Sequence, residues 1–445
     1  MFIVLDQFSV VNPISGGETS VLWTRQTGLT LDLAGPAPQA RATIETLITD
    51  EAALSASADQ DLRVTMLVKD DQLVAQGAPI LELRHQPGIV FTAPMAGRIA
   101  AIDLAPGRRL SEVRLFREDA AGRHEHATTH AQASDAALRE LLLQSGLWRA
   151  FRSRPFGGLP NPDTVPSAIF VAGLDTRPLA PDPALAVRDR EEHIARGVAQ
   201  LLRLTNGPVF LCQEMTGADL FADAARKDRI RDLRVPAIHP WGLPGFLAHR
   251  HQPATITRPV WDIHVEDVAA IGALLATGLG PETRLISVAG PATTEARLVR
   301  CQPGADLRGL CRGRVVHGPH IVQTGSPLDA RPARWLGARD RQVTVIHGAP
   351  PARPRHWLIA ALRRGARPHP IIPTAAADRA LGGAMPTMAL LRALAVGDRE
   401  TAIRLGALSL VGEDLALADY LTCAEPRHST LLEKILHDIA EEEAP

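Results

Sequence analysis

The chain has 445 residues, of which 45% are hydrophobic and 22% are charged, and its formal net charge is −1. This composition is ordinary for a folded soluble protein, the length suggests two to four domains, and the balanced charge gives no reason to expect a nucleic-acid partner. No stretch approaches the roughly 20 apolar residues needed to cross a bilayer, so membrane contact is expected only through partner proteins.

Residues 1–27 match no recognisable pattern and are treated as an N-terminal extension, and a first folded unit is predicted for 28–118. Within it, the run LRVTMLVKDDQLVAQGAPILELRHQPGIVFTAPMAGRIAAIDLAPGRRL alternates short strand-like segments with turns. Gly77, Gly88, Gly97 and Gly107 stand where a positive φ is expected. The pattern resembles the barrel-sandwich hybrid of biotinyl and lipoyl carriers. Its tip, LRHQPGIVF, lacks the lysine that a carrier needs, so an architectural role is expected.

Residues 119–160 are predicted to be a linker followed by a helix. The linker contains His124, His126 and His130, which invite a metal interpretation. A zinc site requires four ligands, and no further ligand group lies nearby in the sequence, so a solvated linker is favoured. The following DAALRELLLQSGLWRAF carries apolar residues at helical spacing.

Residues 161–293 alternate strand and helix patterns, which predicts a Rossmann-like α/β domain with a largely parallel sheet. AIFVAGL, PVFLC and RLISVAG are predicted strands, and EEHIARGVAQLLRLTNG, DLFADAARKD and VAAIGALLATG are predicted helices. Neither GxGxxG nor GxxxxGK[S/T] occurs at a suitable place, so nucleotide signals are weak. The two glycines of HPWGLPG, at 239–245, are interpreted as an ordinary loop rather than a phosphate cradle.

Residues 294–350 are rich in strand signals and are predicted to form a small β-grasp unit of the SLBB type. Residues 351–445 are predicted to be helical, with one short helix at 355–370 and longer ones from Met385 onward. Met388, Leu391 and Leu394 follow helical spacing and are interpreted as core rather than as a cofactor site. The predicted fold class is therefore α/β, in an α+β multidomain arrangement.

The residues themselves indicate no redox or catalytic centre. Cys212, Cys301, Cys311 and Cys423 form no CxxC pair, whereas clusters and structural zinc need closely spaced thiolates. Reduced, buried thiols are expected instead. No local triad or metal motif is present, so no catalytic, cofactor-binding or metal-binding residue is assigned.

Several longer segments together resemble the NqrA family, which is one of the component families of the Na⁺-translocating NADH:quinone reductase (Nqr). The most specific is SGLWRAFRSRPFGGLPNPDTVPSAIFVAGLDTRPLAPDP at 145–183. The others are GLTLDLAGPAPQ at 28–39, HQPGIVFTAPMAGRI at 85–99, HPWGLPG at 239–245, VWDIHVEDVAAIG at 260–272 and RLISVAGPATTEARLVRCQPGADL at 284–307. The chain departs from the family pattern at Gly158, where a lysine is usual, and near Cys423, where a CPGKYE-like run is usual.

The resemblance implies a peripheral subunit on the cytoplasmic side of the bacterial inner membrane. Its complex would pass electrons from NADH to ubiquinone while moving Na⁺. The implied partners are the membrane component NqrB and the remaining components NqrC, NqrD, NqrE and NqrF. Riboflavin, FMN, FAD and Fe–S centres would lie on those partners and none on this chain. The α/β domain would be related to the flavin-binding domain of the NADH subunit of complex I, without its flavin.

The resemblance also places the segment Phe151, Arg152, Arg154, Pro155 and Phe156 near the entry of the quinone, at the face shared with NqrB. Two aromatic rings suit an apolar headgroup, and arginines donate to carbonyl oxygens or pair with carboxylates. The alternative is that the phenylalanines fill a domain junction while the arginines form structural ion pairs.

Two other functional interpretations remain open from the sequence. One is a non-enzymatic scaffold or adaptor of a different membrane redox complex, of the Rnf kind, or a divergent paralogue. The other is a retained flavin or NADH site, for which the sequence offers no fingerprint.

Overall fold

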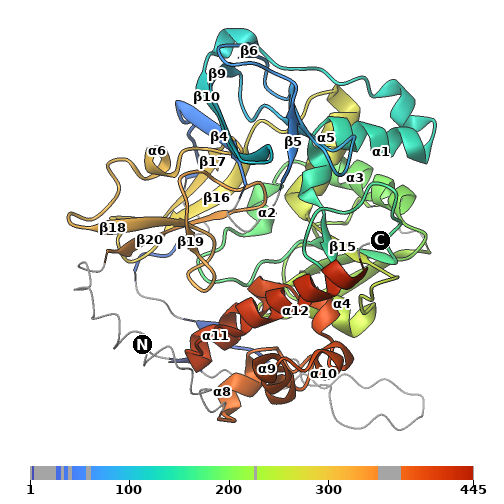
Figure 1. Ribbon diagram of the computed structural model, residues 1–445, viewed down its shortest axis with the longest axis vertical. Helices are drawn as coiled ribbons and strands as arrows, with labels where there is room; N and C mark the ends of the chain where they lie inside the picture. Colours follow the sequence, from blue (N-terminus) through green and yellow to red (C-terminus); the bar gives the residue numbers. More distant parts are fainter. Residues whose placement is uncertain are drawn as a thin grey trace.

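The protein is described by a computed structural model that covers residues 3–4, 27–31, 35–38, 43–56, 62–224, 228–348 and 372–443. Most of the predicted extension 1–27 and the short helix predicted for 355–370 lie outside the described residues. Figure 1 shows four groups of elements: a β unit at the top, an α/β unit on the right, a further sheet on the left and helices along the bottom. None of the helices in the described part of the chain is long and apolar enough to span a membrane.

The first unit is built from two small sheets that face each other across an apolar core. One sheet has the order β4 (Glu51–Ser55), β10 (Arg109–Arg117), β9 (Gly97–Ala105) and β6 (Leu73–Val74). The other has the order β5 (Val64–Met66), β7 (Pro79–Leu83) and β8 (Val90–Thr92). Alternation along β10 buries one of its faces, as in Val113 and Leu115, and the adjacent Ile80 and Leu81 of β7 are both buried. The barrel-sandwich arrangement predicted from the turns is thus present.

The turn glycines follow the expectation at three positions and depart from it at one. Gly77, Gly88 and Gly107 have a positive φ. Gly97 does not. It begins β9, where a Cβ atom would collide with the carbonyl oxygen of Phe116 on the neighbouring strand β10. The positive φ predicted for Gly97 was therefore wrong. The position needs a small residue because the two strands approach closely there, and not because of its backbone conformation.

The α/β unit contains a five-stranded sheet of order β11–β15–β12–β13–β14. Strands β12 (Ala168–Ala172), β13 (Val209–Glu214), β14 (Ile230–Val235) and β15 (Val260–His264) run parallel, and β11 (Arg152–Arg154) joins the edge antiparallel to β15. β12, β13 and β15 are buried along nearly their whole length, which is typical of strands covered on both faces, whereas the edge strands β14 and β11 are more polar and more exposed. This unit also contains the helices α1 (Asp135–Gln144), α2 (Pro183–Ala186) and α4 (Pro244–His251).

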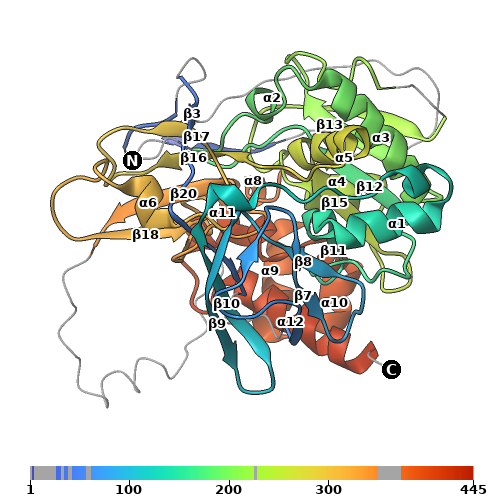
Figure 2. The ribbon, with the colours of Figure 1, turned by 90° about the horizontal axis from the view of Figure 1, so that it is seen from above.

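Helices α3 (Glu191–Leu204) and α5 (Val265–Thr277) pack closely against each other beside this sheet, as Figure 2 shows. Glycines make the contact possible. A Cβ atom at Gly197 would collide with the carbonyl oxygen of Val268, and one at Gly272 would collide with that of His193. The helix backbones therefore touch at these two points, which fixes how α5 lies on the sheet.

Two predicted elements differ in the structure. The segment 219–228 was predicted to be helical, but its described part, 219–224, forms turns. The strand predicted at 284–290 is present as β16 (Arg284–Ala289), but it pairs with β17 (Arg297–Cys301) and β20 (Gln342–His347). It belongs to a second sheet rather than to the five-stranded one.

That second sheet has six strands in the order β19–β18–β20–β16–β17–β3. Its remaining members are β18 (His320–Thr324), β19 (Arg331–Pro332) and β3 (Glu45–Thr46), and the short helix α6 (Leu307–Cys311) packs on it. Because β3 precedes the barrel-sandwich strands in the chain, this sheet is completed by the N-terminal part of the sequence.

The C-terminal helices form a layer whose apolar core also takes in Leu29, Leu243 and Phe246. They are α8 (Ala375–Arg379), α9 (Thr387–Val396), α10 (Arg399–Arg404), α11 (Ala416–Thr422) and α12 (His428–Glu443). Leu391 and Leu394 are buried and Met388 is half-buried, which confirms the interpretation of this stripe as core. Figure 1 shows the layer lying beneath the α/β unit and the six-stranded sheet.

The α3–α5 contact yields the first prediction. Replacing Gly272 by alanine forces the two helix backbones apart, and overpacking of this kind costs about 2 kcal/mol in the free energy of unfolding. Urea unfolding followed by circular dichroism measures the change. Gly280→Ala is the matched control, because a Cβ atom there meets nothing within 4 Å. Equal stability of the Gly272→Ala and Gly280→Ala variants would contradict the close contact.

Candidate functional site

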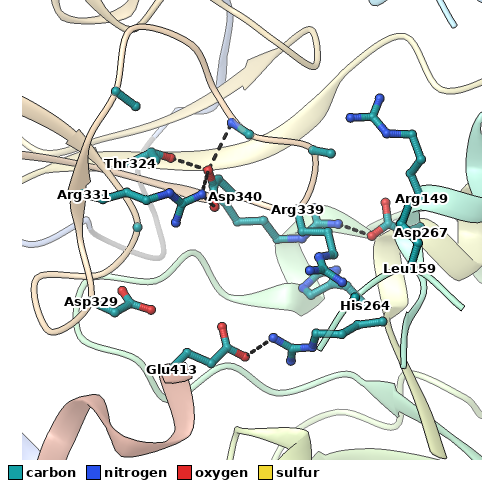
Figure 3. A pocket seen from close by; sticks show the side chains of 18 of the residues that line it. Arg149, Leu159, His264, Asp267, Thr324, Asp329, Arg331, Arg339, Asp340 and Glu413 are labelled. Carbon is teal, nitrogen blue, oxygen red and sulfur yellow. Dashed lines mark hydrogen bonds and ion pairs between the residues drawn. The ribbon is translucent and has the colours of Figure 1, made fainter. Parts of the chain in front are cut away.

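A cavity of about 970 Å³, the central cavity, lies where the four groups of elements meet. This is at the upper end of the volumes usual for small-molecule sites. Its wall takes residues from the barrel-sandwich (Leu62, Phe91), from β15 and its end (Asp262, His264), from the six-stranded sheet (Thr324, Arg341) and from the C-terminal layer (Glu413). Figure 3 shows charged side chains from these separate elements pointing into the same space.

The predicted segment 151–156 lies at one side of this cavity, and its members have different surroundings. Phe151 is fully buried and packs on Trp148 and Trp261, with ring centroids 5.7 and 5.6 Å away. Phe156 is 42% exposed, so the two phenylalanine rings do not share one apolar slot. Arg152 lines the cavity, whereas Arg154 and Pro155 are buried behind it.

Both arginines of the segment belong to a buried ion-pair network, formed by Arg152, Arg154, Arg177, Asp262, Glu413 and Asp414. Arg154, which has no exposed surface, donates from Nε to Asp262 Oδ2 at 3.1 Å and from Nη1 to Asp414 Oδ2 at 2.7 Å. Arg152 donates to Asp262 at 3.0 Å and to Glu413 at 2.6 Å. The network therefore joins the edge strand β11 to the 3₁₀ turn Gly412–Leu415 of the C-terminal layer.

The two carboxylates that the C-terminal turn contributes to the network have pKa values that are shifted in opposite directions. Burial alone would raise the pKa of Glu413, but Arg152, Arg177 and Arg154 outweigh it and hold that pKa well below the usual range. Burial raises the pKa of Asp414 above its ordinary value, against the opposing effect of Arg154. Glu413 is thus a fixed negative charge at the cavity wall.

Asp329, on the loop after β18, is a cavity carboxyl of another kind. Burial raises its pKa to about 6, Arg177 opposes that rise and Glu413 adds to it. Its Oδ1 accepts a hydrogen bond from the backbone N–H of Ser326 at 2.8 Å. Among the described residues no ion pair holds it, so it changes its protonation state within the range of physiological pH.

His264 supplies a neutral donor to the same cavity. Its Nδ1 accepts the backbone N–H of Glu266 at 3.1 Å, at the beginning of α5, which leaves the proton on Nε2. Burial lowers the pKa of His264 well below its ordinary value, and the nearby Arg341, Arg177 and Arg284 lower it further. The imidazole is therefore uncharged, and His264 is one of the side chains that line the cavity (Figure 3).

The comparisons with known proteins agree in pointing to one family. A model described as the NqrA N-terminal barrel-sandwich hybrid domain matches residues 24–118, and one described as the NqrA second alpha/beta domain matches residues 133–279. The NqrA component of the Na(+)-translocating NADH-quinone reductase of Actinobacillus pleuropneumoniae is 32% identical over 94% of this chain and 99% of its own length. The corresponding protein of Neisseria meningitidis serogroup A is 33% identical over 93% of this chain and 98% of its own, and that of a Marinomonas strain is 34% identical over 86% and 91%.

The chain belongs to the NqrA family of Na⁺-translocating NADH-quinone reductase components. The resemblance drawn from the sequence motifs is thereby confirmed. A chain in the crystal structure of an NAD⁺-reducing nickel–iron hydrogenase overlaps 73% of this chain and 72% of its own, with a TM-score of 0.37 and 15% identity. That overlap is too weak to support any inference.

The structure also shows where the other candidate residues named from the sequence lie. His124 and His126 lie edge to face with ring centroids 4.7 Å apart, His130 is exposed, and no metal-binding group of residues occurs in the described part of the chain. Cys212, Cys301 and Cys311 are buried as predicted, while Cys423 is exposed.

The loop 239–245 is shaped by packing. The backbone N–H of Gly242 donates to Thr176 Oγ1 at 3.0 Å, and a Cβ atom at Gly245 would collide with the carboxylate of Asp414. Its glycines are therefore explained without a phosphate, in line with the interpretation as an ordinary loop.

Sequence reasoning missed the residues that give the cavity its charge. Arg149, His264, Asp329, Arg339 and Glu413 come from separate segments and form no local motif. The one available signal was the arginine-rich run RWLGARDRQ at 334–342, whose arginines all line the cavity.

The buried ion-pair network yields a stability prediction. Arg154→Met leaves the buried Asp414 without its ion-pair partner and leaves Asp262 with Arg152 alone, and breaking such a pair costs about 3–5 kcal/mol in the free energy of unfolding. Chemical unfolding followed by tryptophan fluorescence measures the loss. Arg98→Met is the matched control, because its pair with Glu118 is solvent-accessible and of little consequence for stability. A loss no larger than that of the control would show that the network does not hold the layers together.

Asp329 yields a prediction about pH. Its pKa is raised in the folded protein, so its contribution to stability is present below the unfolded pKa near 4 and is lost as the pH rises through about 6. Asp329→Asn should therefore raise the free energy of unfolding by about 2–3 kcal/mol at pH 8 and change little at pH 4. Thermal melting across this range measures it, with the exposed Asp70→Asn as control. An equal effect at both pH values would contradict the raised pKa.

Proposed function

We propose that this chain is the peripheral NqrA component of a Na⁺-translocating NADH:ubiquinone oxidoreductase, and that it supports quinone reduction and assembly without a redox centre of its own. The identity of 32–34% to proteins of that name, along nearly the whole chain, carries the proposal. Flavins and Fe–S centres are placed on partner proteins of the complex, and ubiquinone is the substrate of the complex.

The proposed location is the cytoplasmic side of the bacterial inner membrane, beside the membrane component NqrB and with NqrC, NqrD, NqrE and NqrF in the same assembly. Membrane contact through partners fits the finding that the described helices include none able to span a membrane. We also propose that the α/β unit is related to the flavin-binding domain of complex I and that residues 294–350 are an SLBB-like β-grasp unit. The parallel order β15–β12–β13–β14 and the compact sheet around β16 and β20 support these relations.

For the quinone we propose the part of the central cavity next to segment 151–156. Arg152 lines it and pairs with Asp262 on β15. His264 lies two residues further along β15, on the same face of the strand as Asp262. A guanidinium and a neutral imidazole N–H are suitable donors to the carbonyl oxygens of a quinone headgroup. Asp329 adds a carboxyl that exchanges protons near neutral pH. Phe151, Arg154 and Pro155 support this wall from behind, and Phe156 lies on the adjoining surface.

The test uses the assembled complex in membranes, with NADH as the donor. Arg152→Gln should raise the KM for ubiquinone about tenfold, because a hydrogen bond from a charged donor contributes about 1.5–3 kcal/mol. Arg399→Gln, in an exposed pair with Glu442, is the control and should leave the KM unchanged. An unaltered quinone KM in fully assembled Arg152→Gln complex would exclude this site. Recovery of tagged chain without NqrB would instead favour the scaffold alternative.

A further inference from the structure

The central cavity has a second end at which positive charge is not balanced. Three arginines from separate elements lie around it. Arg149, from the 3₁₀ turn Leu147–Ala150, and Arg339, on the loop before β20, line the cavity, and Arg284, at the start of β16, donates to the carbonyl oxygen of Ala338 beside Arg339. Arg149 lines both the central cavity and a smaller pocket of about 90 Å³ that continues from it, which Arg284 also lines. In the described part of the chain, none of the three forms an ion pair with a carboxylate.

The hydrogen bonds of these arginines leave most of their donors unused. The Cζ atom of Arg149 lies 3.7 Å from the centre of the Phe91 ring, which satisfies no N–H donor. Within the described residues, Arg339 makes two long hydrogen bonds, at 3.4 Å, to the carbonyl oxygens of Phe151 and Gly157. Arg284 donates to the carbonyl oxygen of Ala338, while its Nε is buried without a partner.

The nearest carboxylates are already occupied. Asp267 lines the same space, but it accepts from Arg341 Nη2 at 2.6 Å. Glu266 accepts from Arg341 and from the backbone N–H of Leu285, and it pairs with Arg300 at 3.4 Å. In the described part of the chain the three guanidiniums are therefore left without a carboxylate partner, and an external anion is the natural counter-charge.

The electrostatic consequence of this arrangement is visible in all three groups. Burial, and then Arg284 and Arg339, lower the pKa of Arg149 to about 9. Burial, and then Arg152, lower the pKa of Arg339 to about 10, and burial lowers that of Arg284. Each cation is thus destabilised in the folded protein by desolvation, and for Arg149 also by the other two.

We propose that Arg149, Arg284 and Arg339 form a binding site for the phosphate group of a small molecule whose remainder occupies the central cavity. A phosphate carries up to two negative charges and three or four acceptor oxygens, which matches several planar donor forks better than a carboxylate or a halide does. The site goes beyond quinone binding, since Arg149 lies at the other end of the cavity from Glu413 and Asp329, as Figure 3 shows, while Arg339 lies between Arg149 and the segment 151–157.

The test is binding to the isolated, full-length chain. Inorganic phosphate and adenosine monophosphate are titrated by calorimetry at constant ionic strength, and vesicles containing phosphatidic acid by co-sedimentation. Saturable binding of either soluble probe assigns the site to a free phosphate compound, and binding of the vesicles alone assigns it to a lipid headgroup. In both cases Arg339→Gln should weaken binding about tenfold or more, and so should Arg149→Met, which keeps the packing on Phe91.

Arg331→Gln is the matched control. Arg331 lines the same cavity but pairs with Asp340 at 3.1 Å, so its loss should change phosphate affinity less than twofold. Circular dichroism confirms that each variant is folded, and line broadening of the ³¹P signal of inorganic phosphate gives a second readout. Absence of binding to the wild-type chain, or equal binding by wild type, Arg339→Gln and Arg149→Met, overturns the proposal. Neither result bears on the quinone KM, which is measured separately on the complex.

Discussion

The docking of the C-terminal layer depends on charges that have been removed from water. Arg154 has no exposed surface, and its guanidinium binds Asp262 on the sheet edge and Asp414 in the C-terminal turn. Burying such charges is costly unless every partner is present, so the strand and the turn have to be held in one relative position. Arg152 and Glu413, members of the same network, form part of the cavity wall. The interaction that joins the layers therefore also shapes the candidate site.

The elements that sequence periodicity predicted well are those whose partners are close in the chain or whose apolar pattern is long. Helices α3, α5, α9 and α12 and the strands of the barrel-sandwich are of this kind. The helix predicted at 219–228 failed for a local reason. Asp219 Oδ1 accepts the backbone N–H of Phe221, and Gln213 Oε1 accepts that of Leu220. Side chains thus take backbone donors that a helix would have used.

The sheet that β16 joins and the charged residues that line the cavity could not be predicted for a different reason. The residues that decide them lie far apart in the chain. β16 is recognisable as a strand, but only its pairing with β20, more than 50 residues later, decides which sheet it joins. In the same way Arg152 was recognisable as a residue for ligands or ion pairs, but its partners Asp262 and Glu413 lie in segments that carry no sign of each other. Local patterns specify elements, and the site is specified by contacts between elements.

Two ionisable side chains of the central cavity have pKa values that are shifted in opposite directions. At one end burial raises the pKa of Asp329, and at the other burial and mutual repulsion lower the pKa of Arg149. Each shift lowers the stability of the folded chain near neutral pH, and moving the opposite charges together would relieve both. A fold selected only for stability has no reason to keep them apart across a space of about 970 Å³. In the two proposed sites, these separated charges would orient a ligand with its negative charge toward Arg149. We therefore interpret the stability that is lost through these two shifted pKa values as a consequence of the proposed binding sites.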